Sequence, residues 1–399
     1  MNKLNPRQSE AVRYADGPML VLAGAGSGKT SVITRKIAYL IEQLGIPGRH
    51  IAAVTFTNKA AREMKERVGR IVDRKLTRGL IVSTFHNLGL NMIREEHTHL
   101  GYHPGFSIFD AEDAKALLQD LMLREASAEA GDELNDIQMT ISSWKNAMRG
   151  PAEALSKAAD EREQRIAIIY KKYNEYLKAY NAVDFDDLIL LPVMLFRSNP
   201  DVLAKWRRKI RYMLVDEYQD TNVCQYELVK QLVAERAAFT VVGDDDQSIY
   251  AWRGARPENL AQLKEDFPSL KIVKLEQNYR STARILRSAN TVIANNPHVF
   301  EKALWSDHTI GEEIRIVRCR NEDAETDRVA TEILDQKLKK GLDFRDFAVL
   351  YRGNHQARLL EMKLQAYQIP YRISGGQSFF STNEIKDAMS YLRLLINPD

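Results

Sequence analysis

The sequence predicts an α/β fold in which a parallel sheet is interrupted by an all-helical insertion. Three short apolar runs are typical of buried parallel strands, namely 19–23, 50–55 and 80–84. Amphipathic helical patterns separate them, as in βαβ units. Between about 86 and 208 only helical patterns follow one another, at 110–123, 134–148, 161–180 and 184–196. Strand-like runs return at 212–215, 239–243 and 271–275, so we expect the chain to complete the first sheet there.

A second α/β pattern begins after about residue 276. Its expected strands are 313–317, 347–351 and 370–373, and its expected helices are 322–339, 356–367 and 383–395. We therefore expect a first domain made of 1–85 and 200–275, a helical domain at 86–199, and an unfinished second α/β domain at 276–375.

Composition excludes several classes of protein. With 399 residues, 44% of them hydrophobic, the chain is long and apolar enough to form globular cores, and it is not a disordered chain. No apolar stretch reaches the ~18 residues that a membrane span needs. The two cysteines, Cys224 and Cys319, form neither a disulfide framework nor a zinc site, so we expect a reducing cytoplasm. The 57 basic and 54 acidic residues nearly balance, so net charge does not indicate nucleic acid.

A glycine-rich loop predicts a phosphate site. The residues Ala23-Gly-Ala-Gly-Ser-Gly-Lys-Thr30 follow an apolar strand and begin a helical pattern. Backbone N–H groups of such a loop converge on phosphate oxygens, Lys29 would reach the β- and γ-phosphates, and Thr30 would bind Mg²⁺. Ala23 stands where the general pattern has glycine. The alternative is a loop of small residues without a ligand.

Polar groups at other strand ends could complete this site. Asp216 and Glu217 follow a strand, where Asp216 suits the Mg²⁺ shell and Glu217 could activate water. Such a pair is common at strand ends, so it gains meaning only with the loop. Gln247 follows the next strand and could contact water or the γ-phosphate. Arg280 could stabilise transition-state charge, or form a surface salt bridge instead.

Aromatic and hydroxyl residues recur in the loops after successive strands. In an open α/β sheet these ends bind ligands, and exposed rings there can stack on unpaired bases. Core packing is the better explanation for any single ring, but four such loops favour a single-strand groove. Phe185, in the insertion, adds either a contact or part of a helix cap. The candidate contacts are Thr55, Phe56, Thr57, Asn58, Thr84, His86, Phe185, Tyr250, Trp252 and Arg253.

Seven ordered motifs resemble the superfamily 1A DNA helicases, the UvrD/Rep/PcrA group, and most of all its Rep members. They are the segments 4–8, 23–30, 55–61 (TFTNKAA), 83–86 (STFH), 216–220 (DEYQD), 242–255 (VGDDDQSIYAWRGA) and 275–281 (LEQNYRS). The resemblance implies that Gln8 and Tyr279 hold adenine and that Glu217 is the catalytic base, with Lys29, Gln247 and Arg280 at the phosphates. The implied ATP contacts are Gln8, Ala23, Gly24, Ala25, Gly26, Ser27, Gly28, Lys29, Thr30, Arg35, Tyr279 and Arg280.

The same resemblance implies an ATP- and Mg²⁺-dependent 3′→5′ translocase that binds single-stranded DNA and junctions with duplex. The fold would be a RecA-like P-loop NTPase domain (1A) with a helical accessory domain (1B), an incomplete second RecA-like domain (2A), and the start of accessory domain 2B at 376–399. Implied partners are replication proteins in a bacterial cytoplasm. We expect a truncated helicase that does not unwind alone. A nucleotide-gated single-strand binding module, an ATPase acting on RNA or protein, and the oligomeric state all stay open.

Overall fold

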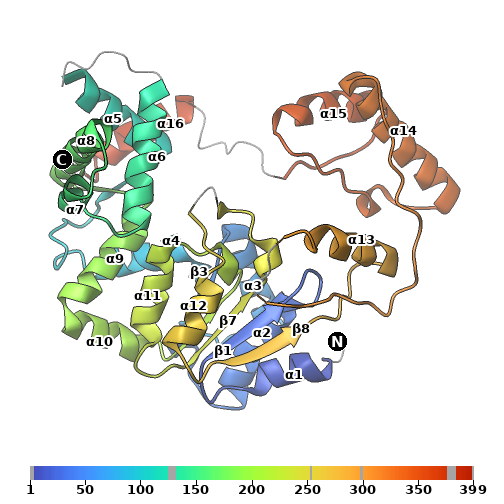
Figure 1. The fold of residues 1–399 in the computed structure, drawn as a ribbon, viewed down its shortest axis with the longest axis horizontal. Coiled ribbons are helices and arrows are strands. Elements are labelled where there is room, and N and C mark those ends of the chain that lie inside the picture. The colour runs from blue at the N-terminus through green and yellow to red at the C-terminus, as the bar shows by residue number, and fades with distance from the viewer. Residues whose placement is uncertain (1–3, 125–131, 252–253, 297–299, 375–382, 398–399) are drawn as a thin grey trace. The chain divides into compact units, whose positions relative to one another are not determined.

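The computed structural model describes residues 4–124, 132–251, 254–296, 300–374 and 383–397 (Figure 1). The chain forms two compact units, which are described separately. The first comprises Met1–Gly311 with Ile396–Asp399, and the second comprises Glu312–Leu395.

The first unit is built on a six-stranded sheet in the order β3-β2-β6-β7-β1-β8. All five strand pairings are parallel, which confirms the predicted α/β class. Because the strands are parallel, their carboxyl ends meet at one edge of the sheet. The strands match the six predicted runs: β1 (Met19–Ala23), β2 (Ile51–Thr55), β3 (Ile81–Thr84), β6 (Tyr212–Val215), β7 (Phe239–Gly243) and β8 (Lys271–Leu275).

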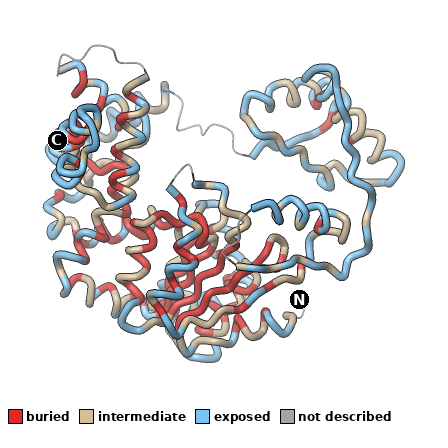
Figure 2. The backbone as a smooth tube through the Cα atoms, in the orientation of Figure 1, coloured by how far each residue is buried: buried red, intermediate tan, exposed pale blue. Residues whose placement is uncertain are grey.

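Helices cover both faces of this sheet, and every residue of β1, β2, β6 and β7 is buried (Figure 2). Residues of β1 alternate between two apolar clusters, with Leu20 in one and Val21 in the other. The Val21 cluster includes α1 (Pro6–Arg13), α2 (Lys29–Glu42) and α3 (Asn58–Gly69). The Leu20 cluster includes α4 (Phe85–Glu95), α9 (Asp187–Ser198), α10 (Pro200–Lys209), α11 (Val223–Val233) and α12 (Asn259–Asp266).

The insertion between β3 and β6 is mainly helical but not entirely so. Its own apolar cluster joins α5 (Ala111–Arg124), α6 (Asp132–Asn146), α7 (Pro151–Ser156) and α8 (Glu161–Ala179). The expectation of an all-helical insertion is wrong, because β4 (Ser107–Phe109) and β5 (Ala182–Asp184) form a parallel pair. Each of these strands has three residues, which is too short to produce a recognisable apolar run.

The second unit contains α14 (Glu322–Lys340), α15 (His355–Ala366) and α16 (Asn383–Leu394). A small core lies between α14 and α15, around Ala330, Ile333 and Leu364. The strands predicted at 313–317, 347–351 and 370–373 are wrong, since the described residues there have no sheet pairing. Apolar side chains in them stay in solvent: Ile316 is 88% exposed and Leu350 is 92% exposed. An apolar run forms a strand only when a neighbouring strand accepts its hydrogen bonds. The remaining helix, α13 (Ala283–Ile293), belongs to the first unit.

Candidate nucleotide site and strand-end surface

The loop between β1 and α2 has the backbone geometry of an anion cradle. Gly26 and Gly28 have φ values of +70° and +89°, a region that L side chains rarely adopt. Gly28 is also the residue that caps α2, so the loop delivers its N–H groups to a helix amino terminus. Ser27 is buried, and its hydroxyl donates to the Gly24 carbonyl at 2.7 Å. The predicted strand, loop and helix are therefore all present.

Gln8 lies directly against this loop. Its Nε2 donates to the Ser27 carbonyl at 2.9 Å, and its Oε1 accepts from the Asn5 N–H at 3.1 Å. Asn5 in turn accepts from the Gln8 N–H at 2.7 Å, which forms a capping box at the start of α1. The whole cap, and not only the amide of Gln8, is thus positioned beside the phosphate loop.

The segment after β8 covers the same loop from another side. The Tyr279 N–H donates to the Gly26 carbonyl at 2.9 Å, and Asn278 Nδ2 donates to the Ala25 carbonyl at 2.6 Å. The Tyr279 hydroxyl accepts from Asn5 Nδ2 at 2.8 Å, and its ring is 46% exposed. An exposed ring next to Gln8 and the loop is placed where a base could stack. The Asn278 contact was not predicted from sequence.

Arg280 also lies beside the loop. A Cβ added at Gly26 would meet the Arg280 Cβ at 2.8 Å. Arg280 is exposed, and the surface salt bridge considered for it is not among the ion pairs of the described residues. Its backbone N–H donates to Asn278 Oδ1 at 2.8 Å, which fixes the turn that carries it. Arg35, the other arginine expected at the nucleotide, is half-buried within α2.

Lys29 contacts two other predicted catalytic groups. Its Nζ lies 2.8 Å from Glu217 Oε2 and 3.3 Å from Gln247 Oε1. These partners follow β6 and β7, so the sheet brings together side chains from three strand ends. Glu217 has a φ of +52°, an uncommon value for a residue with a side chain. Gln219, which sequence reasoning missed, donates from Nε2 to the same Glu217 oxygen at 2.9 Å.

Asp216, the residue predicted to bind Mg²⁺, is buried next to a second carboxylate, that of Glu217. Burial, and then the negative charge of Glu217, raises the pKa of Asp216 to about 7. The pKa of Asp220 is also raised, to about 6, mainly by burial. Its Oδ1 is buried and has no hydrogen-bond partner among the described residues. A divalent cation would relieve both effects. Oxygen donors from Thr30 and Asp216 suit Mg²⁺, which normally takes few protein ligands. Among the described residues, no group of three or more His, Cys, Asp or Glu could hold a metal alone.

The predicted DNA-contacting rings meet in pairs beyond the phosphate loop. Phe56 and Tyr250 are stacked, with ring centroids 5.1 Å apart and planes at 26°. His86 and Phe185 meet edge to face at 6.0 Å, and Phe185 is 48% exposed. Burial lowers the pKa of His86, so its ring is neutral near pH 7. Residues from β2, β3, the β7 loop and the insertion therefore converge on neighbouring surfaces.

The polar residues predicted beside these rings have mixed roles. Thr57 and Thr84 cap α3 and α4, accepting from the N–H groups of Ala60 at 3.1 Å and Asn87 at 3.3 Å. Asn58 Oδ1 accepts from Asn87 Nδ2 at 3.0 Å. The Thr55 hydroxyl is buried and has no partner in the described part of the chain. Trp252 and Arg253 lie outside the described residues.

Two buried lysines near this edge were not predicted. Lys145 is fully buried, with its Nζ 2.7 Å from Asp184 Oδ2 and 2.8 Å from Asp187 Oδ1. Asp184 also accepts from the Asp187 N–H at 2.9 Å, whereas Asp186, at the N-cap of α9, makes no side-chain cap hydrogen bond. Lys302 lies among the carboxylates of Asp244, Asp245 and Asp246. Both contacts join parts of the chain that are far apart in sequence. The one signal in the sequence that could have indicated them is the runs of acidic residues, because buried carboxylates require a nearby cation.

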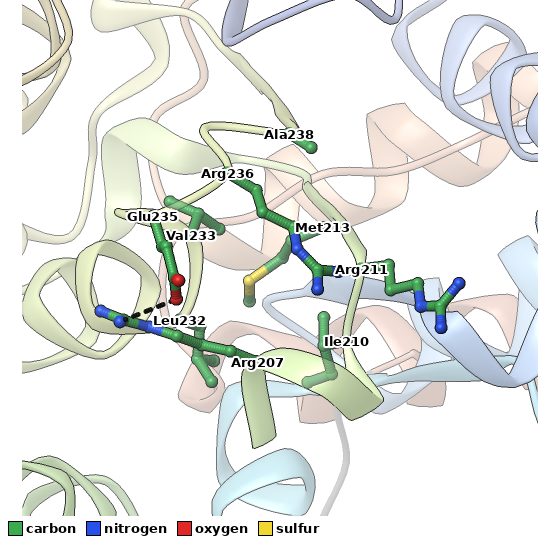
Figure 3. Close-up of a pocket in the computed structure, with 9 residues that line it drawn as sticks. All are labelled: Arg207, Ile210, Arg211, Met213, Leu232, Val233, Glu235, Arg236 and Ala238. Atoms are coloured by element: carbon green, nitrogen blue, oxygen red, sulfur yellow. Dashed lines mark hydrogen bonds and ion pairs between the residues drawn. The ribbon is translucent and has the colours of Figure 1, made fainter. Parts of the chain in front are cut away.

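A hollow elsewhere on the first unit is unrelated to this site. Figure 3 shows it beside the start of β6, at the opposite end of that strand from Asp216. Arg207 and Glu235 pair across it at 3.3 Å. Its lining residues are Arg207, Ile210, Arg211, Met213, Leu232, Val233, Glu235, Arg236 and Ala238.

No helix in the described ranges is long and apolar enough to traverse a bilayer.

The parallel sheet, the glycine loop after β1 and the acidic pair after β6 define a P-loop nucleotide-binding domain. The sequence model of the UvrD/REP helicase N-terminal domain matches residues 4–268, and that of the UvrD-like helicase C-terminal domain matches 273–399. The chain therefore belongs to the UvrD/Rep helicase family.

Two curated relatives illustrate this membership. The chain is 56% identical to the ATP-dependent DNA helicase Rep of Escherichia coli over 100% of its own length and 59% of that protein. It is 42% identical to the ATP-dependent DNA helicase PcrA of Staphylococcus aureus, over 100% of its length and 54% of that protein. The chain thus spans little more than half of these relatives. A solved Pif1 helicase from Candida albicans matches weakly, with 11% identity, coverage of 75% of this chain and 46% of that one, and a TM-score of 0.35.

Proposed function

We propose that this chain is the ATP-binding and single-strand-binding part of an ATP-dependent 3′→5′ DNA helicase that acts in replication or restart. The observation that carries the proposal is the cluster of Lys29, Glu217 and Gln247 at the phosphate loop. The names of the relatives, ATP-dependent DNA helicases Rep and PcrA, support the substrate and the activity. The paired rings at neighbouring strand ends support single-stranded DNA as the ligand.

In the nucleotide site, Lys29 and the loop N–H groups would hold the phosphates. ATP would draw Lys29 away from Glu217, which leaves that carboxylate free to accept a proton from the attacking water. Arg280 would stabilise charge on the γ-phosphate. Gln247, whose Nε2 donates to Asp244 and whose Oε1 accepts from Lys29, would accept a hydrogen bond from the attacking water. A Mg²⁺ ion bound by Thr30 and Asp216 would neutralise phosphate charge.

The adenine would lie between the Gln8 amide and the exposed Tyr279 ring. Arg35 is included among the nucleotide contacts on family resemblance. In this arrangement the base and the triphosphate bind to the same loop from two sides, so adenine recognition and phosphate binding reinforce each other.

For DNA, we propose that bases stack on Phe56, Tyr250 and Phe185 near His86. Trp252, Arg253, Thr55, Thr57, Asn58 and Thr84 complete the proposed surface. The natural ligand would be a single strand or its junction with duplex, in the bacterial cytoplasm with replication proteins nearby.

We propose a domain division at 1–85 with 200–275 (1A), 86–199 (1B), 276–375 (2A) and 376–399 (2B). The family models change at 268–273, close to the proposed 1A–2A boundary. The compact units divide later, at Gly311, because the segment after β8 packs on the phosphate loop of the first unit.

The test is ATP hydrolysis by this chain with and without oligo(dT), with Lys29→Ala as the blank. Stimulation that disappears in Lys29→Ala supports coupled nucleotide and DNA sites. ATP-dependent binding of oligo(dT) without hydrolysis would instead favour a nucleotide-gated binding module. Stimulation by RNA in place of DNA would overturn the assigned ligand.

A further inference from the structure

Lys302 is enclosed by three consecutive carboxylates. Its Nζ lies 2.5 Å from Asp244 Oδ1 and 3.0 Å from Asp246 Oδ2, and it also pairs with Asp245. Its side chain is 4% exposed. The Phe300 N–H donates to Asp245 Oδ2 at 3.2 Å, so the backbone before Lys302 is attached to the same group.

The cluster depends on the lysine charge. Burial alone lowers the pKa of Lys302, but its hydrogen bonds and ion pairs with Asp244 and Asp245 outweigh burial and raise it. Three adjacent carboxylates repel one another when they are buried without a cation. Replacing the ammonium by an apolar group therefore forces Asp244 and its neighbours to move or to take up protons.

Asp244 transmits this charge to the nucleotide site. One carboxylate oxygen binds Lys302, and the other accepts from Gln247 Nε2. An amide has one donor end and one acceptor end, so this bond turns Gln247 Oε1 towards Lys29. The Asp244 N–H also donates to Gln219 Oε1 at 3.0 Å, and Gln219 Nε2 donates to Glu217.

We propose that Lys302 acts as a positioning residue in ATP hydrolysis. Lys302 and Gln247 both bind the carboxylate of Asp244, and through this shared carboxylate Lys302 orients Gln247. This inference rests on the proposed function. The lysine itself is placed behind Asp244 rather than at the phosphate loop, so it acts on rate through the geometry of Gln247 and, by way of Gln219, of Glu217.

The experiment is a double-mutant cycle between Lys302→Met and Gln247→Ala, read in the kcat and KM of DNA-stimulated ATP hydrolysis. Because small misplacements of a catalytic group strongly reduce rate, Lys302→Met should lower kcat about tenfold while KM for ATP stays within about twofold. In the Gln247→Ala background the same change should have almost no further effect, since its target is already absent. Lys302→Arg, which keeps the charge, should retain most of the rate.

Lys274→Met is the matched control. Lys274 donates to the Glu301 carbonyl at 2.6 Å, so it contacts the same segment without reaching the carboxylates, and its loss should leave kcat unchanged. Thermal unfolding of each variant identifies any loss of folding. If Lys302→Met is unfolded, the double-mutant cycle is measured with Lys302→Arg instead. Equal effects of Lys302→Met with and without Gln247 would overturn the proposal.

Failure of the proposed function gives a different result. If the unmodified chain binds ATP without hydrolysing it, the hydrolase assignment is overturned, and the same cycle is then measured as ATP affinity. Non-additive changes in affinity would still support positioning of Gln247 by Lys302, whereas additive changes would overturn it. A chain that does not bind ATP overturns both.

Discussion

Two regions lie along the edge of the sheet where the strands end. They differ in whether their polar side chains already have hydrogen-bond or ion-pair partners within the protein. At the phosphate loop, Lys29 binds both Glu217 and Gln247. Beyond it, Phe56 and Tyr250 meet as partly buried rings, and the buried hydroxyls of Thr55 and Ser83 have no hydrogen-bond partner among the described residues. A buried charge must be paired before its ligand arrives, whereas a ring can keep a face available.

This difference separates the expected effects of mutation. Ligand binding at the phosphate loop exchanges internal partners for phosphate, so its variants should change rate by orders of magnitude. Binding at the ring pairs adds stacking area, so its variants should change DNA affinity by smaller factors.

Lys29→Ala should lower kcat/KM for ATP by about a thousandfold, because the loop loses its only proposed side-chain charge on the β- and γ-phosphates. Steady-state hydrolysis with saturating oligo(dT) measures the effect. Lys65→Ala, which removes an exposed lysine of α3, is the control and should behave like the unmodified chain. A rate in Lys29→Ala within a few-fold of the original would contradict the phosphate site.

Glu217→Gln should lower kcat by about a hundredfold or more, since the amide keeps the shape of the side chain but accepts no proton. ATP should bind as tightly as before or more tightly, because Lys29 is no longer held by a carboxylate at 2.8 Å. Single-turnover hydrolysis and equilibrium binding of a fluorescent ATP analogue separate the two quantities. A parallel loss of affinity would indicate that Glu217 mainly organises the site.

Phe56→Ala should weaken oligo(dT) binding by about tenfold, which corresponds to the loss of one stacked base at roughly 1–3 kcal/mol. Tyr250→Ala should have a similar effect, and the double variant should be less than additive because the rings contact each other. Fluorescence anisotropy measures the affinity. Tyr391→Ala, at an exposed ring of the second unit, is the control. ATP affinity without DNA should change little in any of these variants.

Acidity should affect the nucleotide region even without ligand. The pKa of Asp216 is about 7 in the folded chain, against an ordinary value of 3.8, so between these values the folded state holds a proton that the unfolded state has lost. The free energy of unfolding should therefore fall as pH rises from about 4 to 7, by about 2 kcal/mol or more from this group. Urea unfolding at several pH values measures the slope, and Asp216→Asn should reduce it. If the free energy of unfolding of Asp216→Asn depended on pH as steeply as that of the unmodified chain, the raised pKa of Asp216 would be contradicted.

Sequence reasoning succeeded where local pattern determines structure. The apolar runs of β1, β2 and β6 and the Gly-Lys-Thr turn each carry their information within a few residues, so the sheet and the loop were predictable. The pairs β4–β5 and Lys302–Asp244 join segments far apart in sequence, and no local pattern specifies them. Conversely, the run at 313–317 has a strand-like pattern but no strand beside it in the described residues.

The candidate site shows the same division. The residue types at Lys29, Glu217 and Gln247 could be predicted because the chemistry of phosphate transfer limits the choice. The orientation of Gln247 could not, because it depends on Asp244 accepting its amide proton while binding Lys302. Gln219 was missed for a similar reason, since its role appears only when β6 and β7 lie side by side.

The most direct test of the central claim is ATP hydrolysis as a function of oligo(dT) concentration in the unmodified chain and in Phe56→Ala. If the two regions form one coupled site, oligo(dT) should raise the rate, and Phe56→Ala should shift the half-maximal concentration upwards by about tenfold with little change in the maximal rate. A rate that does not respond to oligo(dT) in the unmodified chain would contradict the account.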